Sequence, residues 1–283
     1  MRPLIIILAL VSSLHAQLNI SLKPVKSQFV AYEDIAVEIS ITNRSGRTLF
    51  FKGAKRSNWL DFDITDQHGD LLPYNGEPPV YQALELHAGQ TLKRKITISN
   101  SYDLTRYGKY RVSAYVKLPG QDGMALKSQS SSFLVSNGRV LYNQSIGMSQ
   151  NNTARTYQVM VFNGSERSDI YTKIIDSDTK QVYSCQPLSQ VIMTKTPSAA
   201  LDANNNLHLL YLITQLTYTH VVVDPTGKII KRSYHKPGAV NDPSLLSFAD
   251  GSVTVTGSIP FDPFAQQKKK ATERKLSDRP GNF

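Results

Sequence analysis

The strongest constraint on the fold is an alternation of apolar and polar residues with a period of two, interrupted by turn residues about every ten positions. In residues 35–41, Ile35, Val37, Ile39 and Ile41 alternate with smaller or polar neighbours. This period is that of a half-buried β-strand, and we find no convincing helical period. The expected strands of the first half are 35–41, 48–51, 60–64, 92–98 and 107–116.

Turn residues separate these strands, as in 43–46 (Asn-Arg-Ser-Gly) and 66–70 (Asp-Gln-His-Gly-Asp). Roughly seven short strands with such spacing predict a β-sandwich over residues 17–136. The whole chain is therefore predicted to be all-β, and Trp59 is expected to be at least partly buried in the first domain.

The N-terminal segment 1–16 is expected to be a cleavable signal peptide. Arg2 precedes an uncharged run, 4–14, and small Ala16 follows. The run is shorter than the roughly 20 apolar residues that span a bilayer, and Gln17 stands where a lipid-modified cysteine would have to be. We therefore expect a mature chain that begins at Gln17, is secreted or periplasmic, and has no transmembrane segment.

Cysteine content limits how the mature chain can be stabilised. Cys185 is the single cysteine, so no internal disulfide can form and stability must come from buried apolar area. We interpret Cys185 as a small buried hydrophobe, with a catalytic thiol or an intermolecular disulfide as alternatives. Low cysteine usage in an exported chain favours a bacterial source.

The formal charge of +10 is partly a property of the C-terminal tail. Residues 266–283 are rich in Lys and Arg and lack apolar periodicity, so we expect a disordered basic tail. The tail is interpreted as solvated, with tethering to an anionic surface as the alternative. The remaining charge is spread widely and gives no nucleic-acid groove.

Five short motifs occur in the first domain: 42–46, 63–66 with Gly69, Leu86 with 89–91, 102–104 and 107–112. Together they resemble a bacterial immunoglobulin-like module. Similar modules form the intracellular proteinase inhibitors of bacilli, and the resemblance covers under a third of the chain. It implies an immunoglobulin-like β-sandwich in which Tyr107 or Tyr110 makes a tyrosine-corner bond. The chain differs from that group in its leader and its second domain, and no functional residue is carried over.

An internal repeat organises residues 140–265. Tyr171–Asp176 matches Tyr218–Val223 at a spacing of 47, and Pro197-Ser198 matches Pro243-Ser244 at a spacing of 46. A β-rich period of this size resembles β-propeller blades. We predict two to three blade-like antiparallel repeats, which cannot close a propeller alone because closure needs about 4 to 8 blades.

The repeat predicts equivalent strands and open edges. Tyr157–Phe162, Leu207–Leu212 and Val253–Gly257 are expected to be equivalent inner strands. The hairpin turns at 176–179, 224–227 and 249–252 are matched to one another. An open stack leaves strand edges that invite pairing, so a homo-oligomer formed through blade edges is one expected assembly.

No catalytic, cofactor-binding or metal-ligating residue is predicted, and no cofactor. His-Glu-x-x-His, Gly-x-Ser-x-Gly and phosphate-binding loops are absent from the sequence. His208 and His220 belong to strands of one unit and could meet, but a metal site would need a third ligand. Asp176–Asp178 and Asp202–Asn206 are interpreted as turns and not as calcium loops. Triad catalysis follows no spacing rule, so the enzyme question stays open while the interpretation leans against activity.

Three functional hypotheses remain. The preferred one is an exported, non-catalytic binding or scaffolding protein for a protein or polysaccharide of unknown identity. The second is a protease inhibitor or regulator, which would present the segment Tyr74–Tyr81 with Pro78-Pro79 as a rigid exposed loop. The third is an extracellular hydrolase with a site between the blade units, which a pocket joining His208 or His220 to two carboxylates would favour.

Overall fold

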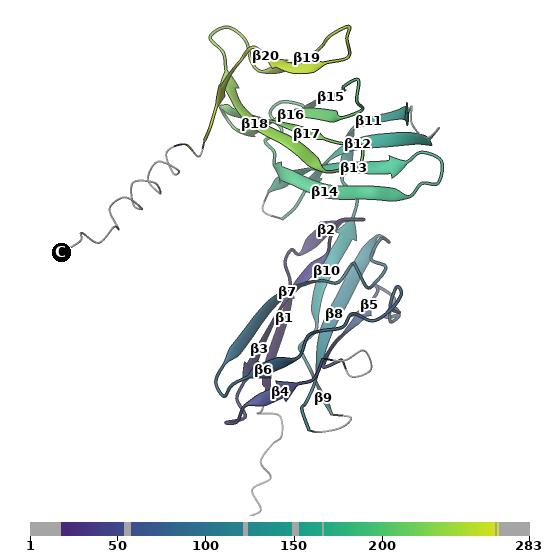
Figure 1. The fold of residues 1–283 in the computed structure, drawn as a ribbon, viewed down its shortest axis with the longest axis vertical. Coiled ribbons are helices and arrows are strands. Elements are labelled where there is room, and N and C mark those ends of the chain that lie inside the picture. The colour runs from purple at the N-terminus through teal and green to yellow at the C-terminus, as the bar shows by residue number, and fades with distance from the viewer. Residues whose placement is uncertain are drawn as a thin grey trace, which may run out of the picture. The chain divides into compact units, whose positions relative to one another are not determined.

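The computed structural model describes residues 18–53, 58–120, 124–148, 153–165, 167–263 and 265. The expected leader, 1–16, and the expected tail, 266–283, lie outside the described residues. Every secondary-structure element of the described residues is a β-strand, which confirms the all-β prediction (Figure 1). No helix in this part of the chain is long and apolar enough to cross a membrane. The chain divides into two compact units, Met1–Ser136 and Asn137–Phe283.

The first unit contains two main sheets with one core between them. One sheet has the order β1-β3-β7, and the other has the order β2-β10-β8-β5 with β9 paired to β8. β4 and β6 form a separate pair. All pairs in this unit are antiparallel except β2 with β10, which is parallel. The strands are β1 Leu18–Pro24, β2 Gln28–Val30, β3 Ala36–Asn43, β4 Leu49–Phe51, β5 Leu60–Thr65, β6 Leu84–Leu86, β7 Thr91–Thr97, β8 Gly108–Lys117, β9 Ala125–Lys127 and β10 Ser131–Ser136.

The shared core explains why the alternating pattern folds in this way. Val37, Ile39 and Ile41 of β3 are buried together with Leu60 and Ile64 of β5, in one cluster that draws side chains from both sheets. Each fully buried aliphatic side chain stabilises the fold by roughly 1.5–3 kcal/mol. The result is a β-sandwich, as predicted for this part of the chain.

Trp59 lies in this core, with 3% of its surface exposed, so its predicted burial is confirmed. Of the two tyrosines predicted to make the corner bond, Tyr110 makes it. Its hydroxyl donates to the Arg106 carbonyl at 2.8 Å, and its ring stacks on Phe133. Tyr107 is 59% exposed.

The second unit is built from antiparallel strands that follow one another along the chain. The first sheet has the order β11-β12-β13-β14, and the second has the order β15-β16-β17-β18-β21. β19 and β20 form a two-stranded hairpin. The strands are β11 Arg139–Met148, β12 Thr153–Asn163, β13 Ser168–Asp176, β14 Val182–Gln190, β15 Ser198–Leu201, β16 Leu207–Thr214, β17 Thr217–Val223, β18 Ile229–Pro237, β19 Ser244–Ser247, β20 Val253–Thr256 and β21 Ser258–Phe261.

One core joins the two large sheets of this unit. Tyr157 and Val159 of β12 are buried in the same cluster as Leu207, Leu209 and Tyr211 of β16. A smaller cluster on the other face of β16 and β17 packs against Leu245 and Val255 of the β19–β20 hairpin. The described residues contain no closed propeller.

The predicted inner strands are equivalent only in part. β12 and β16 are each the second strand of a sheet and have a partner on both sides, whereas β20 is the second strand of a two-stranded hairpin and pairs on one side only. The matching of the turns was partly wrong. The turns at Asp176 and Asp224 both join a third strand to a fourth, whereas the turn at 249–252 joins a first strand to a second. Its true equivalent is the turn at 202–206, because both turns precede a second strand.

Candidate functional site

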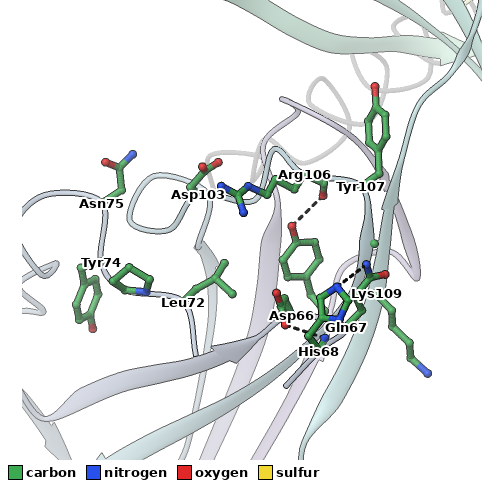
Figure 2. A pocket seen from close by; sticks show the side chains of 13 residues that line it. Asp66, Gln67, His68, Leu72, Tyr74, Asn75, Asp103, Arg106, Tyr107 and Lys109 are labelled. Atoms are coloured by element: carbon green, nitrogen blue, oxygen red, sulfur yellow. Dashed lines mark hydrogen bonds between the residues drawn. The ribbon is translucent and has the colours of Figure 1, made fainter. Parts of the chain in front are cut away.

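A pocket of about 430 Å³ lies at one end of the first unit, where two connecting segments meet. One segment follows β5, and the other leads into β8. Figure 2 shows the side chains that these segments place around the pocket. The lining residues are Asp66, Gln67, His68, Leu72, Pro73, Tyr74, Asn75, Asp103, Arg106, Tyr107, Gly108, Lys109 and Tyr110.

The two carboxylates of the pocket accept hydrogen bonds from groups of their own turns. Asp66 Oδ1 accepts from the backbone N–H groups of His68 at 2.8 Å and Asp70 at 3.0 Å. Burial opposes the ionised form of Asp66, but these N–H bonds outweigh it and hold its pKa below the ordinary value. Asp103 Oδ1 accepts from the backbone N–H and the hydroxyl of Thr105, at 3.1 and 2.6 Å. Both acids therefore act as turn formers.

The cations of the pocket have no such partners. No described residue forms an ion pair or a side-chain hydrogen bond with the side chains of Arg106 and Lys109. Arg106 is positioned through its carbonyl, which holds the Tyr110 hydroxyl. The exposed ring of Tyr107 points away from Asp66, Gln67 and His68 in Figure 2. Arg106 and Lys109 thus leave positive donors at the rim of the pocket without a partner among the described residues, which suits an anionic group.

The loop between Tyr74 and Gln82 borders this pocket, and its first end is anchored. The Tyr74 hydroxyl donates to the Asp61 carboxylate, and its ring lies 4.8 Å from that of Tyr102. Burial and then the bond to Asp61 raise the pKa of Tyr74, so the phenol remains a donor. Tyr102, whose pKa burial raises to about 12, donates to the Phe62 carbonyl at 2.7 Å.

The second end of the loop is anchored on the buried Trp59. The indole Nε1 donates to the Gln82 carbonyl at 3.0 Å, and the Tyr81 ring packs 6.1 Å from the indole. Asn58 donates to the Pro79 carbonyl and accepts from the Tyr81 N–H. Gly53 also approaches the Tyr81 carbonyl so closely that a Cβ there would clash with backbone.

Residues 75–78, Asn-Gly-Glu-Pro, are exposed between these two anchors. They form a loop tip on a fixed base, because both flanking tyrosines are partly buried and hydrogen bonded. Pro78-Pro79 marked this segment in the sequence, whereas its anchors come from β5, from the residues just before β5 and from the segment before β8. Nothing in the sequence pattern pointed to Arg106, and Lys109 entered only as part of the strand motif 107–112.

In the second unit, the structure brings together the two histidines that the sequence had paired. His208 Nδ1 lies 3.1 Å from His220 Nε2, and His208 Nε2 lies 3.2 Å from Asp202 Oδ2. His235 on the next strand hydrogen bonds to the hydroxyls of Ser233 and Ser258, each at 3.0 Å. The three imidazoles lie side by side because β16, β17 and β18 are neighbours.

This histidine cluster, defined by His208, His220 and His235, is buried. Each residue is at most 8% exposed. Burial and then the neighbouring His208 and His235 lower the pKa of His220 to about 4. Among the described residues one carboxylate, Asp202, contacts the cluster, and no group of three or more side chains is arranged to hold a metal ion. The pairing with two carboxylates that would favour a hydrolase is therefore not formed in this part of the chain.

The comparisons with known proteins leave this chain without a family. No protein-family model matches it. No curated protein matches it either. Among solved structures, the sporulation control protein Spo0M from Bacillus subtilis aligns over 93% of this chain and 97% of its own, with 7% identity and a TM-score of 0.28. The periplasmic chaperone SfaE aligns over 76% of this chain and 98% of its own, with 9% identity and a TM-score of 0.24. Function must therefore be argued from the residues themselves.

Proposed function

We propose that this protein is an exported, non-catalytic binding protein whose first unit is an immunoglobulin-like domain. The strand orders β1-β3-β7 and β2-β10-β8-β5, the parallel edge pair and the Tyr110 corner bond all support that assignment. Domains of this type commonly bind ligands through loops at one end of the sandwich. Export rests on the leader 1–16, and N-terminal sequencing of exported protein should begin at Gln17.

The observation that carries the proposal is the exposed tip 75–78 on an anchored base, directly beside the pocket with Arg106 and Lys109. A loop that is already ordered loses little conformational entropy on binding. Arg106 and Lys109 supply cationic donors at the rim of the pocket with no partner among the described residues. The ligand that fits best is an extended protein segment carrying acidic side chains.

Alanine variants of the two pocket cations test this binding surface. A fluorescein-labelled hexaglutamate peptide is the probe, and fluorescence anisotropy at low salt gives its Kd. Arg106→Ala and Lys109→Ala are each expected to weaken binding by about tenfold or more, because each removes a charge-assisted contact worth about 1.5–3 kcal/mol.

Lys93→Ala is the matched control, since Lys93 is an exposed cation on β7 outside the pocket. It should leave the Kd unchanged. Equal weakening by all three variants would show a diffuse attraction of a basic protein for an acidic peptide and would contradict a built site.

Protease inhibition is a second candidate, and the anchored loop favours it as well. A tip held at both ends can occupy a protease cleft without being released after cleavage, which is the requirement for an inhibitor loop. Subtilisin activity should fall as the full chain is added, and replacing 75–78 by Gly-Gly should abolish the effect. Rapid cleavage of the wild-type chain at this loop with no loss of protease activity would refute this function.

A further inference from the structure

Strand β20 leaves one edge of the second unit unpaired. β20 pairs with β19 on one side, and no described residue pairs with the backbone on its other side. The chain turns away at Gly257, which has a φ of +67°, and the next strand, β21, pairs with β18 instead. In Figure 1, β19 and β20 stand as a separate hairpin beyond β18. The hairpin has half the strands of the β11–β14 sheet.

The hairpin turn fixes which backbone groups face the open edge. Phe248 donates its N–H to the Ser252 carbonyl at 2.9 Å, which closes the hairpin. Hydrogen-bonded and non-hydrogen-bonded pairs alternate along an antiparallel ladder, so the pair Leu246–Thr254 is hydrogen bonded and the pairs on either side are not. The N–H and C=O groups of Val253 and Val255 therefore point outward.

This edge lacks the usual protection against strand addition. Monomeric proteins protect edges with charged side chains, proline or bulges. Three other edge strands of this unit carry such protection: β14 contains Pro187 and two register shifts, β21 contains Pro260, and β11 begins with Arg139 and has a register shift. β20 reads Val-Thr-Val-Thr, and no charged residue occurs from 251 to 261. An uncharged edge does not repel a copy of itself.

We propose that a second copy of this chain pairs with this edge, β20 against β20 in antiparallel orientation. The outward groups of Val253 and Val255 lie symmetrically about Thr254, so a two-fold axis at Thr254 lets Val253 of each copy pair with Val255 of the other. All the outward groups of both residues then gain partners. The product is a four-stranded sheet in the order β19-β20-β20-β19.

The hairpin is held in place for such pairing. Leu245 and Val255 pack against Leu210, Leu212 and Tyr218 on the face of the second sheet. The side chain of Thr254 is exposed on the opposite face, and Leu246, its cross-strand neighbour, is 45% exposed. The inference does not depend on the ligand site of the first unit.

Cysteine cross-linking of the full chain tests the register. Across the axis the two Thr254 residues form a non-hydrogen-bonded pair with Cα atoms about 4.5 Å apart, within the roughly 4.4–6.8 Å that a disulfide spans. Thr254→Cys is therefore expected to give a covalent dimer under mild oxidation. Leu246→Cys is the matched control, since it lies on the same face but about 14 Å from its copy, three strand spacings away.

Sedimentation of the wild-type chain should show a mass that rises with concentration, and Thr254→Lys should shift it to monomer at low salt. Thr254→Cys and Thr254→Lys both change an exposed residue, and far-UV circular dichroism checks that each variant folds. A wild-type chain that stays monomeric over the whole concentration range, or equal cross-linking of the two cysteine variants, would overturn the proposal. Both cysteine variants are made in a Cys185→Ser background, so that any cross-link comes from the introduced cysteine.

Discussion

Replacing Asn43 by aspartate is expected to destabilise the first unit by about 3 kcal/mol or more. Asn43 is fully buried at the end of β3. Its Nδ2 donates to the carbonyls of Arg47 at 2.7 Å and Leu86 at 2.8 Å, and its Oδ1 accepts from the N–H and hydroxyl of Ser45. The amide thus ties the β3–β4 turn to β6 with all its hydrogen-bonding capacity used.

An aspartate at this position would turn the donor into an acceptor facing two carbonyl oxygens. The buried negative charge would have no compensating cation among these contacts, and both carbonyls would lose their donor. Asn43→Ala removes the bonds without adding the charge, so a smaller loss of about 2 kcal/mol is expected. The order of the two variants separates charge burial from bond loss.

Urea unfolding followed by Trp59 fluorescence measures both effects, because the single tryptophan is buried in the same core. Asn100→Asp is the matched control: the same chemical change at an exposed position of the same unit should leave the midpoint nearly unchanged. The Asn43→Asp variant should also regain stability as the pH is lowered, since its introduced carboxyl becomes neutral. A midpoint equal to that of the control would contradict this account.

The sequence was sufficient to predict strands where an alternating pattern was long enough to show a period. The five strands predicted in the first unit correspond to β3, β4, β5, β7 and β8. β2, β6 and β9 were missed, and each is three residues long. β4 has the same length, but its three consecutive apolar residues marked it without a period. Such segments are too short to show a period and are extended because a neighbouring strand offers hydrogen bonds. β1 and β10 were also missed, although their apolar residues alternate.

The candidate site could not be assembled from the sequence, because its parts meet only after the strand order is known. The segments that carry His68 and Arg106 adjoin β5 and β8, and these strands pair directly. The anchors of the 74–82 loop likewise come from Trp59 and Tyr102, on either side of it in sequence. The misassigned turn at 249–252 has the same origin, since Asp-Gly turn chemistry is shared by different hairpins and does not identify a position in the sheet.

The histidine cluster predicts that acid selectively loosens the second unit. His220 has its pKa lowered to about 4 by burial and by His208 and His235, and burial also lowers the pKa of His235. In the unfolded chain a histidine titrates near 6.5. Between pH 6.5 and 4 the unfolded chain therefore binds protons that the folded chain does not bind, so stability falls as the pH is lowered through this window.

No carboxylate among the described groups around His220 offsets the lowering of its pKa. His208 and His235 face it from β16 and β18, Lys231 adds a positive charge on β18, and the packed hairpin contributes the apolar Leu245 and Val255. Within the described part of the chain, Asp202 is the one carboxylate in contact with the cluster, and it reaches His208 and not His220. We expect about 2 kcal/mol of stability to be lost between pH 7 and 4.5, after allowing for partial solvent screening.

The His220→Gln variant distinguishes this cause from general acid unfolding. Glutamine can still hydrogen bond to His208 but does not titrate, so hydrogen exchange in residues 207–223, corrected for its intrinsic pH dependence, should change much less with pH than in the wild type. His87→Gln, a change of an exposed histidine of the first unit, should keep the wild-type pH dependence.

The loss of stability in acid must also appear above pH 4. Aspartates with lowered pKa values, such as Asp202 and Asp224, stabilise the folded chain while they are ionised, and this contribution is lost only as the pH falls below the ordinary carboxylate range. If the second unit loses stability only below pH 4, in both the wild type and His220→Gln, these turn aspartates cause the acid sensitivity and the histidines do not.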